Sequence, residues 1–188
     1  MAISAGARMS ITTKTGDDGT TALMFGRRVK KSDPRITACG ACDELNAALG
    51  IVRAFLQDGD LQETILGIQK ELVIVMGELG VADEDRERYK SKGFPLVDAT
   101  MTDRLTALVD DLEKNHQLRF THWATPGATR ESALFDSART VCRRAERAAL
   151  EMVERGFPVS DEIVRYLNRL SDLCWLYARY IETRTGLA

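Results

Sequence analysis

Apolar residues recur at steps of three and four positions along most of the chain, which is the spacing of an amphipathic helix. Five segments carry such a stripe. They predict helices over about 36–57 and 60–82, a third around Met101–Leu112, a fourth over about 132–155, and a fifth that continues to about Ile181. Because no segment shows convincing strand alternation, the predicted fold class is all-α, an antiparallel five-helix bundle.

Three stretches lack a helical period. Residues 83–98 are charged and contain Gly and Pro, and residues 115–131 contain a Pro-Gly pair, so both are predicted to be loops. Residues 11–35 are crowded with Gly, Thr, Asp and Lys. They predict an irregular polar arm that precedes the bundle.

The ends of the later helices carry capping signals. Thr100 or Thr102 is expected to cap the third helix, and Ser160 or Asp161 the fifth. Gly156 follows the fourth helix and is expected to end it.

The chain has 188 residues and a mass of 20.9 kDa, and we expect one domain over 1–188 with the bundle at 36–184. The net charge is −2, so bulk attraction to nucleic acid or to an anionic membrane is not expected. No run approaches the roughly 20 apolar residues of a membrane span. Residues 1–10 lack the apolar run of a secretory signal and are expected to be disordered, in a cytoplasmic protein.

We expect no protein-bound metal centre. The four cysteines, Cys39, Cys42, Cys142 and Cys174, include one CxxC pair, but no second CxxC or close His pair completes a zinc site. Glu113-x-x-His116 occurs once, whereas a di-iron bundle needs two such motifs. Free buried thiols are the expected state of the cysteines.

The segment ARTVCRRAER in the fourth predicted helix concentrates arginines on one face. At about 100° per residue, Arg139, Arg143 and Glu146 fall within about 60° of one another, with Arg147 at the edge. This face points away from the apolar stripe. It is either a solvated basic surface or an anion site, since the guanidinium fork suits phosphate oxygens.

Polar residues also lie opposite the apolar stripes of the first and fifth predicted helices. In YLNRLSD, Asn168 and Asp172 share a side with Trp175 and Leu176, which suggests a second buried contact such as a subunit interface. In GACDELNAALG, Asp43 lies opposite its stripe. It is either an acid favoured by the helix dipole or a partner for an arginine of another subunit.

The arm segment TKTGDDGTT is rich in Gly and Thr and has lysines nearby. Backbone N–H groups of such a segment can bind phosphate oxygens. It lacks the GxxxxGK[ST] pattern and no strand is predicted before it, so a P-loop is excluded. A flexible terminal arm without a ligand is the alternative.

Five segments in this order resemble the PduO-type ATP:cob(I)alamin adenosyltransferases. They are TKTGDDGTT at 13–21, RVKKSDPR at 28–35, CGACDELNAALG at 39–50, ARTVCRRAER at 138–147 and YLNRLSD at 166–172. The resemblance implies a five-helix bundle that forms a homotrimer with active sites between subunits. It also implies transfer of the 5′-deoxyadenosyl group of ATP to the Co(I) of cob(I)alamin, with Mg²⁺ accompanying the triphosphate.

The resemblance assigns roles residue by residue. The arm that wraps the ATP phosphates is matched at Thr13, Lys14, Thr15, Gly16, Thr21, Ala22 and Lys31. The ATP-contacting cluster is matched at Arg143, Arg144, Glu146, Arg147 and Asn168, with Arg143 the main catalytic arginine. Asp43 and Arg139 match an intersubunit salt bridge that supports catalysis, and Asp172 is expected to be structural at the site.

One loop departs from the family pattern. Where the family has Phe, two residues and Pro-Gly-Gly, this chain has Trp123-Ala-Thr-Pro-Gly-Ala128. The family's Phe displaces the lower axial ligand of cobalamin, which makes Co(II) easier to reduce, and Trp123 is expected to do the same. The natural corrinoid stays open, and a reductase or an adenosylcobalamin-dependent mutase is a possible protein partner. The alternative function is a non-catalytic bundle that binds a nucleotide or acidic partner through its arginine face.

Overall fold

The structure is a computed structural model that describes residues 12, 14–116, 118 and 124–186. Its long helices are α1 (Pro34–Phe55), α2 (Gly59–Leu79), α4 (Ala99–Asn115), α5 (Arg130–Glu154) and α6 (Asp161–Arg184). The prediction of a mainly helical protein is confirmed, with a short additional helix, α3 (Arg86–Ser91), and a small sheet in the described part of the chain.

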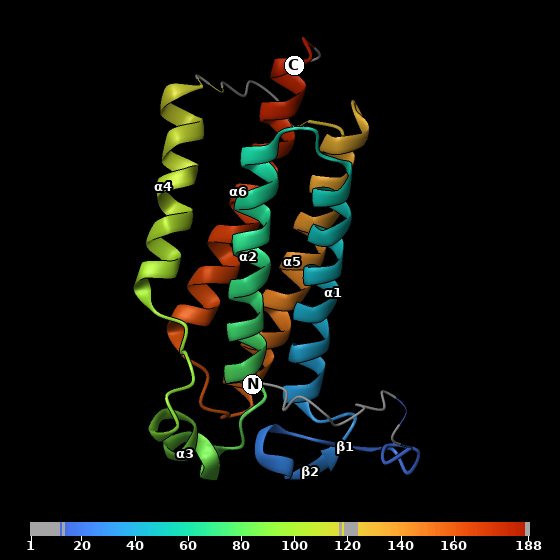
Figure 1. The fold of residues 1–188 in the computed structure, drawn as a ribbon, viewed down its shortest axis with the longest axis vertical. Coiled ribbons are helices and arrows are strands. Elements are labelled where there is room, and N and C mark those ends of the chain that lie inside the picture. The colour runs from blue at the N-terminus through green and yellow to red at the C-terminus, as the bar shows by residue number, and fades with distance from the viewer. Residues whose placement is uncertain (1–11, 13, 117, 119–123, 187–188) are drawn as a thin grey trace, which may run out of the picture.

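Each long helix runs opposite to the one before it (Figure 1). The spatial order differs from the chain order: α1 packs against α2 and α5, α5 packs against α6, and α6 packs against α4. Consequently α4 and α6 lie side by side and run in the same direction (Figure 1). Helix α5 has two long neighbours, so its buried arc is wider than that of a surface helix.

The predicted apolar stripes form one contiguous core. The residues that were expected to face inward in the first helix are all buried, namely Ala41, Leu45, Leu49, Val52 and Leu56. Cys42 and Cys174 are buried with them, and this burial raises the pKa of each thiol to about 12. No helix among the described residues is long and apolar enough to cross a membrane.

One of the three predicted helix ends differs from the structure. The N-cap of α4 is Asp98, whose carboxylate accepts from the backbone N–H groups of Thr100 and Met101, so the prediction of Thr100 or Thr102 was wrong. A cap must precede the first turn for its oxygen to reach those donors. Ser160 caps α6, as one of the two alternatives proposed, and the left-handed Gly156 follows α5 as expected.

The arm and the first loop are more ordered than predicted. Strands β1 (Thr20–Ala22) and β2 (Arg28–Lys30) form an antiparallel hairpin in which Thr21 lies opposite Val29. Strands of three residues are too short to show an alternation, so the irregular-arm prediction missed them. The charged segment 83–98 contains α3 and a 3₁₀ turn, η2 (Asp83–Asp85), because Tyr89 supplies a buried anchor there.

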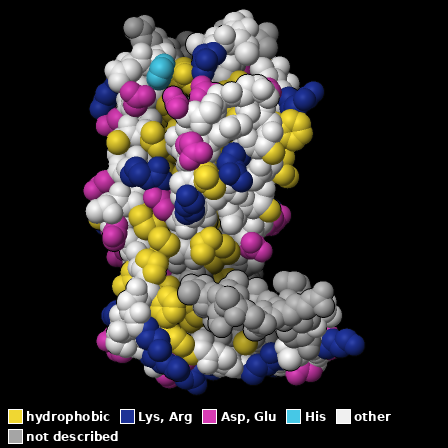
Figure 2. Space-filling model, in the orientation of Figure 1, with side chains coloured by type: hydrophobic (Ala, Val, Ile, Leu, Met, Phe, Trp, Pro, Cys, Tyr) yellow, Lys and Arg dark blue, Asp and Glu magenta, His cyan; other side chains and the backbone are white. Residues whose placement is uncertain are grey.

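Lysines, arginines and acidic residues are interspersed over the face that α1, α2 and α4 present (Figure 2). Beneath this surface, two clusters of charged side chains lie between helices of the described bundle. Between α2, α4 and α6, Glu71 binds Arg104 through two hydrogen bonds of 2.9 and 2.6 Å and accepts a third, of 2.8 Å, from the hydroxyl of Tyr166. This cluster fastens α4 to the rest of the bundle.

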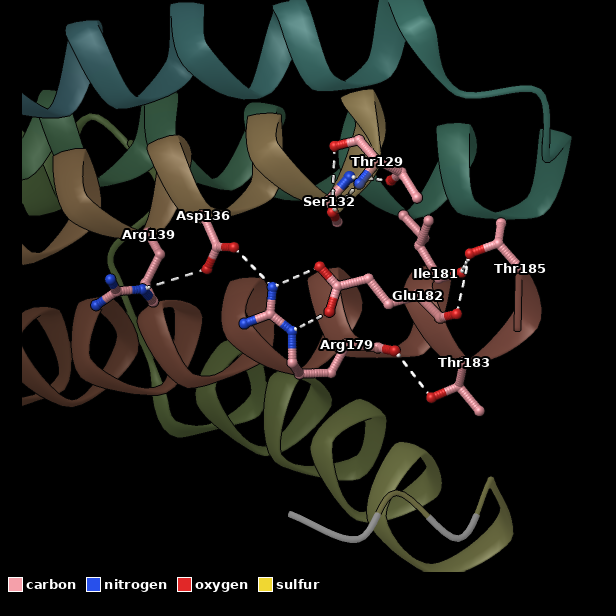
Figure 3. A network of polar contacts seen from close by, with 9 residues as sticks. All are labelled: Thr129, Ser132, Asp136, Arg139, Arg179, Ile181, Glu182, Thr183 and Thr185. Carbon is pink, nitrogen blue, oxygen red and sulfur yellow. Dashed lines mark hydrogen bonds and ion pairs between the residues drawn. The ribbon is translucent and has the colours of Figure 1, made fainter. Parts of the chain in front are cut away.

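The second cluster is buried between α5 and α6 (Figure 3). Arg179, which is 3% exposed, donates to Asp136 at 2.7 Å and to Glu182 at 2.9 Å. Asp136 also lies 3.8 Å from Nε of Arg139. One buried cation therefore neutralises two buried carboxylates. Arg139 is the outermost residue of this series of ion pairs.

We expect Arg179→Met to destabilise the protein by about 3–5 kcal/mol, because it leaves two buried carboxylates without their cation. Such carboxyls would have raised pKa values in the folded state and bind protons more readily than in the unfolded chain. The free energy of unfolding of the variant therefore falls as pH rises. Its loss of stability relative to wild type should be smaller at pH 5 than at pH 8. Chemical denaturation at both pH values measures it.

Arg165→Ala is the matched control, since it breaks an exposed ion pair with Glu162 on the same helix. It should cost at most about 1 kcal/mol. Equal losses for both variants, or a deficit independent of pH, would contradict a stabilising role for the buried cluster.

Candidate active site

A groove of about 420 Å³ lies between α4, α5 and α6. Helix α5 contributes Arg139 and Arg143, and apolar side chains from the other two helices share the same hollow. The complete lining is Val109, Glu113, Arg139, Arg143, Arg169, Ser171, Asp172, Trp175 and Leu176. The groove therefore offers cationic groups for an anion next to apolar surface for a flat or bulky group.

Arg143 is held from behind by a buried acid. Glu146, which is 5% exposed, lies 2.5 Å from Nη1 of Arg143, and its other oxygen accepts from the side-chain amide of Asn168 at 3.1 Å. The expectation that Glu146 faces outward with the arginines was wrong. Helix α5 packs against both α1 and α6, so this edge of its polar face is covered.

Arg139 is positioned in a similar way. Its Nε is buried and faces Asp136, and its terminal nitrogens are directed away from that carboxylate (Figure 3). Asp136 in turn binds Arg179. The two groove arginines of α5 are thus backed by carboxylates of the α5–α6 interface, which leaves their remaining N–H groups for the groove.

Acidic groups also line the groove. Asp172 lies 3.1 Å from Nη1 of Arg169. Burial raises the pKa of Asp172, and this effect outweighs the lowering by Arg169 and Arg143. Glu113 lines the groove, whereas His116 packs on Tyr180, so the two do not form a metal pair. Over the described ranges, no three His, Cys, Asp or Glu side chains are grouped so as to hold a metal ion.

The arm residues lie in and before the hairpin, at the end of the bundle where α1 begins (Figure 1). Lys14 has a left-handed backbone, with φ of 58°. The side chain of Lys31 crosses close to Gly16, where an added Cβ would lie 3.3 Å from Nζ. Glycine at this position lets the ammonium group approach the backbone of the loop, which is the arrangement of an anion-binding turn.

Arg28 fastens the loop to the hairpin. Its guanidinium donates to the carbonyl of Thr15 at 2.5 Å, to Asp18 at 3.3 Å and to the hydroxyl of Thr20. Asp18 also accepts from the backbone and hydroxyl of Thr20, and these hydrogen bonds lower its pKa. Sequence reasoning missed Arg28. The charge-complementary pair of Asp18 and Arg28 flanking a short turn is the signal that could have indicated it.

The structure does not bring all predicted residues together. Within the described chain, Lys14, Thr21 and Lys31 make no ion pair or side-chain hydrogen bond with α5 or α6. Asp43 is exposed on α1 and has no ion pair among the residues that the structure describes. Its neighbour Glu44 pairs instead with Arg144 of α5.

For the remaining predicted residues, the structure gives their element and how exposed they are. Arg147 is exposed on α5, Thr21 is half-buried, and Ala22 is exposed on the hairpin. Trp175 lines the groove as a half-buried residue, but Leu176, expected on the same outward side, is 3% exposed. Thr13 and Trp123 lie outside the described residues.

A sequence profile of the family described as cobalamin adenosyltransferase matches residues 11–181. The corrinoid adenosyltransferase of Bacillus subtilis is 34% identical over 183 residues, covering 95% of this chain and 90% of that protein. The corrinoid adenosyltransferase PduO of Salmonella typhimurium is 35% identical over 175 residues, covering 91% of this chain. This chain spans about half, 49%, of the length of that Salmonella protein.

Solved structures give the same result. A variant PduO-type ATP:corrinoid adenosyltransferase from Lactobacillus reuteri, complexed with cobalamin and ATP, superposes with a TM-score of 0.84 at 28% identity. The match covers 94% of this chain and 93% of the other. Profile, sequence and structure agree over nearly the whole described bundle, and this chain belongs to the cobalamin adenosyltransferase family.

Proposed function

We propose that this protein transfers the 5′-deoxyadenosyl group of ATP to the Co(I) of a corrinoid, releasing triphosphate. The observation that carries the proposal is the groove in which Arg139 and Arg143, each backed by a buried carboxylate, adjoin the apolar surface of Trp175. Curated relatives are named corrinoid adenosyltransferases, and a solved relative is complexed with both cobalamin and ATP.

The reaction is a displacement at carbon. The cobalt electron pair of Co(I) forms a bond to C5′ of ATP, the C5′–O bond breaks, and its electrons leave with the triphosphate. No protein nucleophile or proton transfer is needed. The protein has to hold cobalt and C5′ in line and to neutralise the negative charge that grows on the leaving oxygen.

Arg143 is the group we assign to the leaving triphosphate. Glu146 occupies one of its terminal nitrogens and leaves other N–H groups for phosphate oxygens. Asn168 shares Glu146, so the arginine, the acid and the amide form one positioned set. Arg144 and Arg147 would supply further positive charge near the phosphates, from the exposed side of α5.

The arm supplies the second half of the proposed ATP site. Lys14, Thr15, Gly16, Thr21, Ala22 and Lys31, together with Thr13, would surround the phosphates with backbone N–H groups and ammonium charge. Mg²⁺ would accompany the triphosphate as its counter-ion, bound through phosphate oxygens. A reductase that delivers Co(I), or a mutase that takes the product, would be the protein partners.

A second candidate function is a bundle that binds a nucleotide or acidic partner without turnover. The exposed arginines of α5 are the observation that favours it. The two functions separate in one assay: the enzyme converts Co(I) corrinoid and Mg-ATP into a light-sensitive Co–C product with release of triphosphate. Nucleotide binding without that product would support the binding module instead.

The active site would be completed between subunits of a homotrimer. The hairpin lies at the end of the bundle where α1 begins, whereas Arg139 and Arg143 line the groove between α4, α5 and α6. Asp43 is exposed without an ion pair in the described chain. A neighbouring subunit could place its Asp43 against Arg139, which has terminal nitrogens pointing outward. Asp172 would help to hold the arginines of the groove on the other side.

We expect light scattering to give the mass of a trimer of this 20.9 kDa chain. A mass near 21 kDa at micromolar concentration would contradict the intersubunit site. Asp43→Asn should lower turnover at saturating ligands more than it lowers ATP affinity, because it loosens the interface around Arg139. Steady-state kinetics together with ATP titration would measure the two effects separately.

We expect Arg143→Ala to lower turnover by roughly 10²–10³-fold, by comparison with the loss of other groups that meet developing negative charge. Arg143→Lys should restore only part of the rate, because an ammonium group lacks the guanidinium fork. Arg155→Ala, at the C-cap of the same helix and also paired with a glutamate, is the matched control and should keep full turnover. Near-wild-type turnover of Arg143→Ala would remove Arg143 from the mechanism.

Trp123 remains a prediction from sequence, as the residue that expels the lower axial ligand of the corrinoid. Trp123→Ala should strongly impair reduction-coupled turnover of Co(II)alamin. It should affect Co(II)inamide far less, since that substrate lacks the lower nucleotide ligand, and pre-reduced Co(I) less still. Equal losses with all three substrates, together with a lower melting temperature, would indicate a packing role.

A further inference from the structure

The hairpin that carries the proposed phosphate-binding residues is joined to α1 through residues 31–33, and its closed end makes non-covalent contacts with the segment that follows α2. The backbone N–H of Met24, just after β1, donates to the carbonyl of Gly80 at 3.0 Å. Arg27, just before β2, donates through Nε to Asp85 at 3.1 Å. Both partners belong to the segment between α2 and α3.

Phe25 adds an aromatic contact at the same end. Its ring lies 4.3 Å from the guanidinium carbon of Arg88 and 6.1 Å, edge to face, from the ring of Phe94. Phe94 stacks on the buried Tyr89 at 4.8 Å. The backbone of Phe25 is left-handed, with φ of 67°, a conformation that a bulky residue adopts only where its surroundings compensate the strain.

The surface that receives the closed end is itself fixed to the bundle. Asp83 of η2 binds Arg35 of α1 at 2.9 Å. Glu78, at the end of α2, lies 3.7 Å from Arg86 and accepts from the backbone of Val97 at 2.9 Å. The segment 80–94 is therefore a rigid platform, which we call the η2–α3 platform.

The open end of the hairpin carries the candidate ligand-binding groups. The backbone N–H of Lys31 donates to the carbonyl of Gly19 at 2.9 Å, next to the pairing of Thr20 with Lys30. Lys14, Gly16 and the ammonium of Lys31 lie around the loop that precedes this pair. Because strands of three residues span only about 10 Å, the docking of the closed end and the short connection from Lys31 to α1 together fix where these groups lie.

We propose that Phe25 and Arg27 are positioning residues for ATP: by docking on Arg88 and Asp85 of the η2–α3 platform, they fix where the phosphate-binding end of the hairpin lies. They would not touch ATP themselves. This inference rests on the proposed function, since it requires that the arm binds the triphosphate. It assigns a role to the charged segment 83–94, which lies outside the groove and the arm.

The test is the ATP dependence of adenosyl transfer in the full chain. Arg27→Gln should raise the KM for ATP about 2- to 5-fold, the range of a partly exposed ion pair. Phe25→Gly removes the ring, while glycine adopts the left-handed backbone without strain. This variant should raise the KM for ATP about tenfold. The KM for the corrinoid and the turnover number at saturating ATP should stay within about twofold of wild type. Phe25→Tyr, which keeps the ring, should restore the wild-type KM.

Two further variants separate positioning from general damage. Arg184→Gln breaks another ion pair between distant parts of the chain, with Asp58 at 2.9 Å, at the other end of the bundle, and should leave the KM for ATP unchanged. Arg27→Asp places a carboxylate against Asp85 and should raise the KM for ATP beyond the Arg27→Gln value. The added change Asp85→Arg should bring it back toward wild type.

An unchanged KM for ATP in Arg27→Gln and Phe25→Gly would overturn the proposal. The proposal would also be overturned if turnover number and melting temperature fell while both KM values rose by a similar factor. That pattern would indicate a purely structural role. The absence of any Co–C product from wild-type protein is a different result, because it would contradict the proposed function. In that case, calorimetric titration of the same variants with Mg-ATP tests the positioning role, and unchanged affinity would overturn it.

Discussion

The groove depends on carboxylates that are buried behind two half-buried arginines. Glu146 lies behind Arg143, and Asp136 lies behind Arg139. An arginine on a helix surface has many rotamers, and binding a ligand would cost the entropy of fixing one of them. An acid at its base restricts those rotamers before the ligand arrives. The buried acids need compensation of their own, which Asn168 and Arg179 provide from α6.

This dependence explains why α5 and α6 are the most closely associated helices of the bundle. Each of the two buried acids of α5 finds a second partner on α6, so a shift of one helix along the other would leave a buried charge without its partner. The Glu71 cluster acts in the same way between α2, α4 and α6, where Arg104 and Tyr166 share one carboxylate. The third wall of the groove, α4, is thereby fixed against the two helices that carry the arginines.

The five long helices could be predicted from sequence because their apolar stripes are long and regular, as from Ala41 to Leu56 in α1. The hairpin could not, because a strand such as Thr20–Ala22 contains too few residues to show a period. The inward position of Glu146 also escaped prediction. A helical projection assumes one buried side, whereas α5 packs on two helices, and only the fold reveals the second contact. The candidate arginines and Glu146 were predictable as a set, but the role of Glu146 and Asp136 in orienting the arginines was not.

The two parts of the proposed ATP site are built on different physical principles. In the groove, a few arginines are fixed by buried charge in a low-dielectric interface, which suits stabilisation of charge that appears only in the transition state. In the arm, Gly16, backbone N–H groups and Lys31 sit in exposed turns, which suits binding of phosphates that are charged throughout the reaction. A displacement in which the corrinoid itself is the nucleophile needs both functions and no catalytic base. The placement of the oriented arginines on the bundle and of the proposed phosphate-binding turn on a separately docked hairpin follows that division of the chemistry.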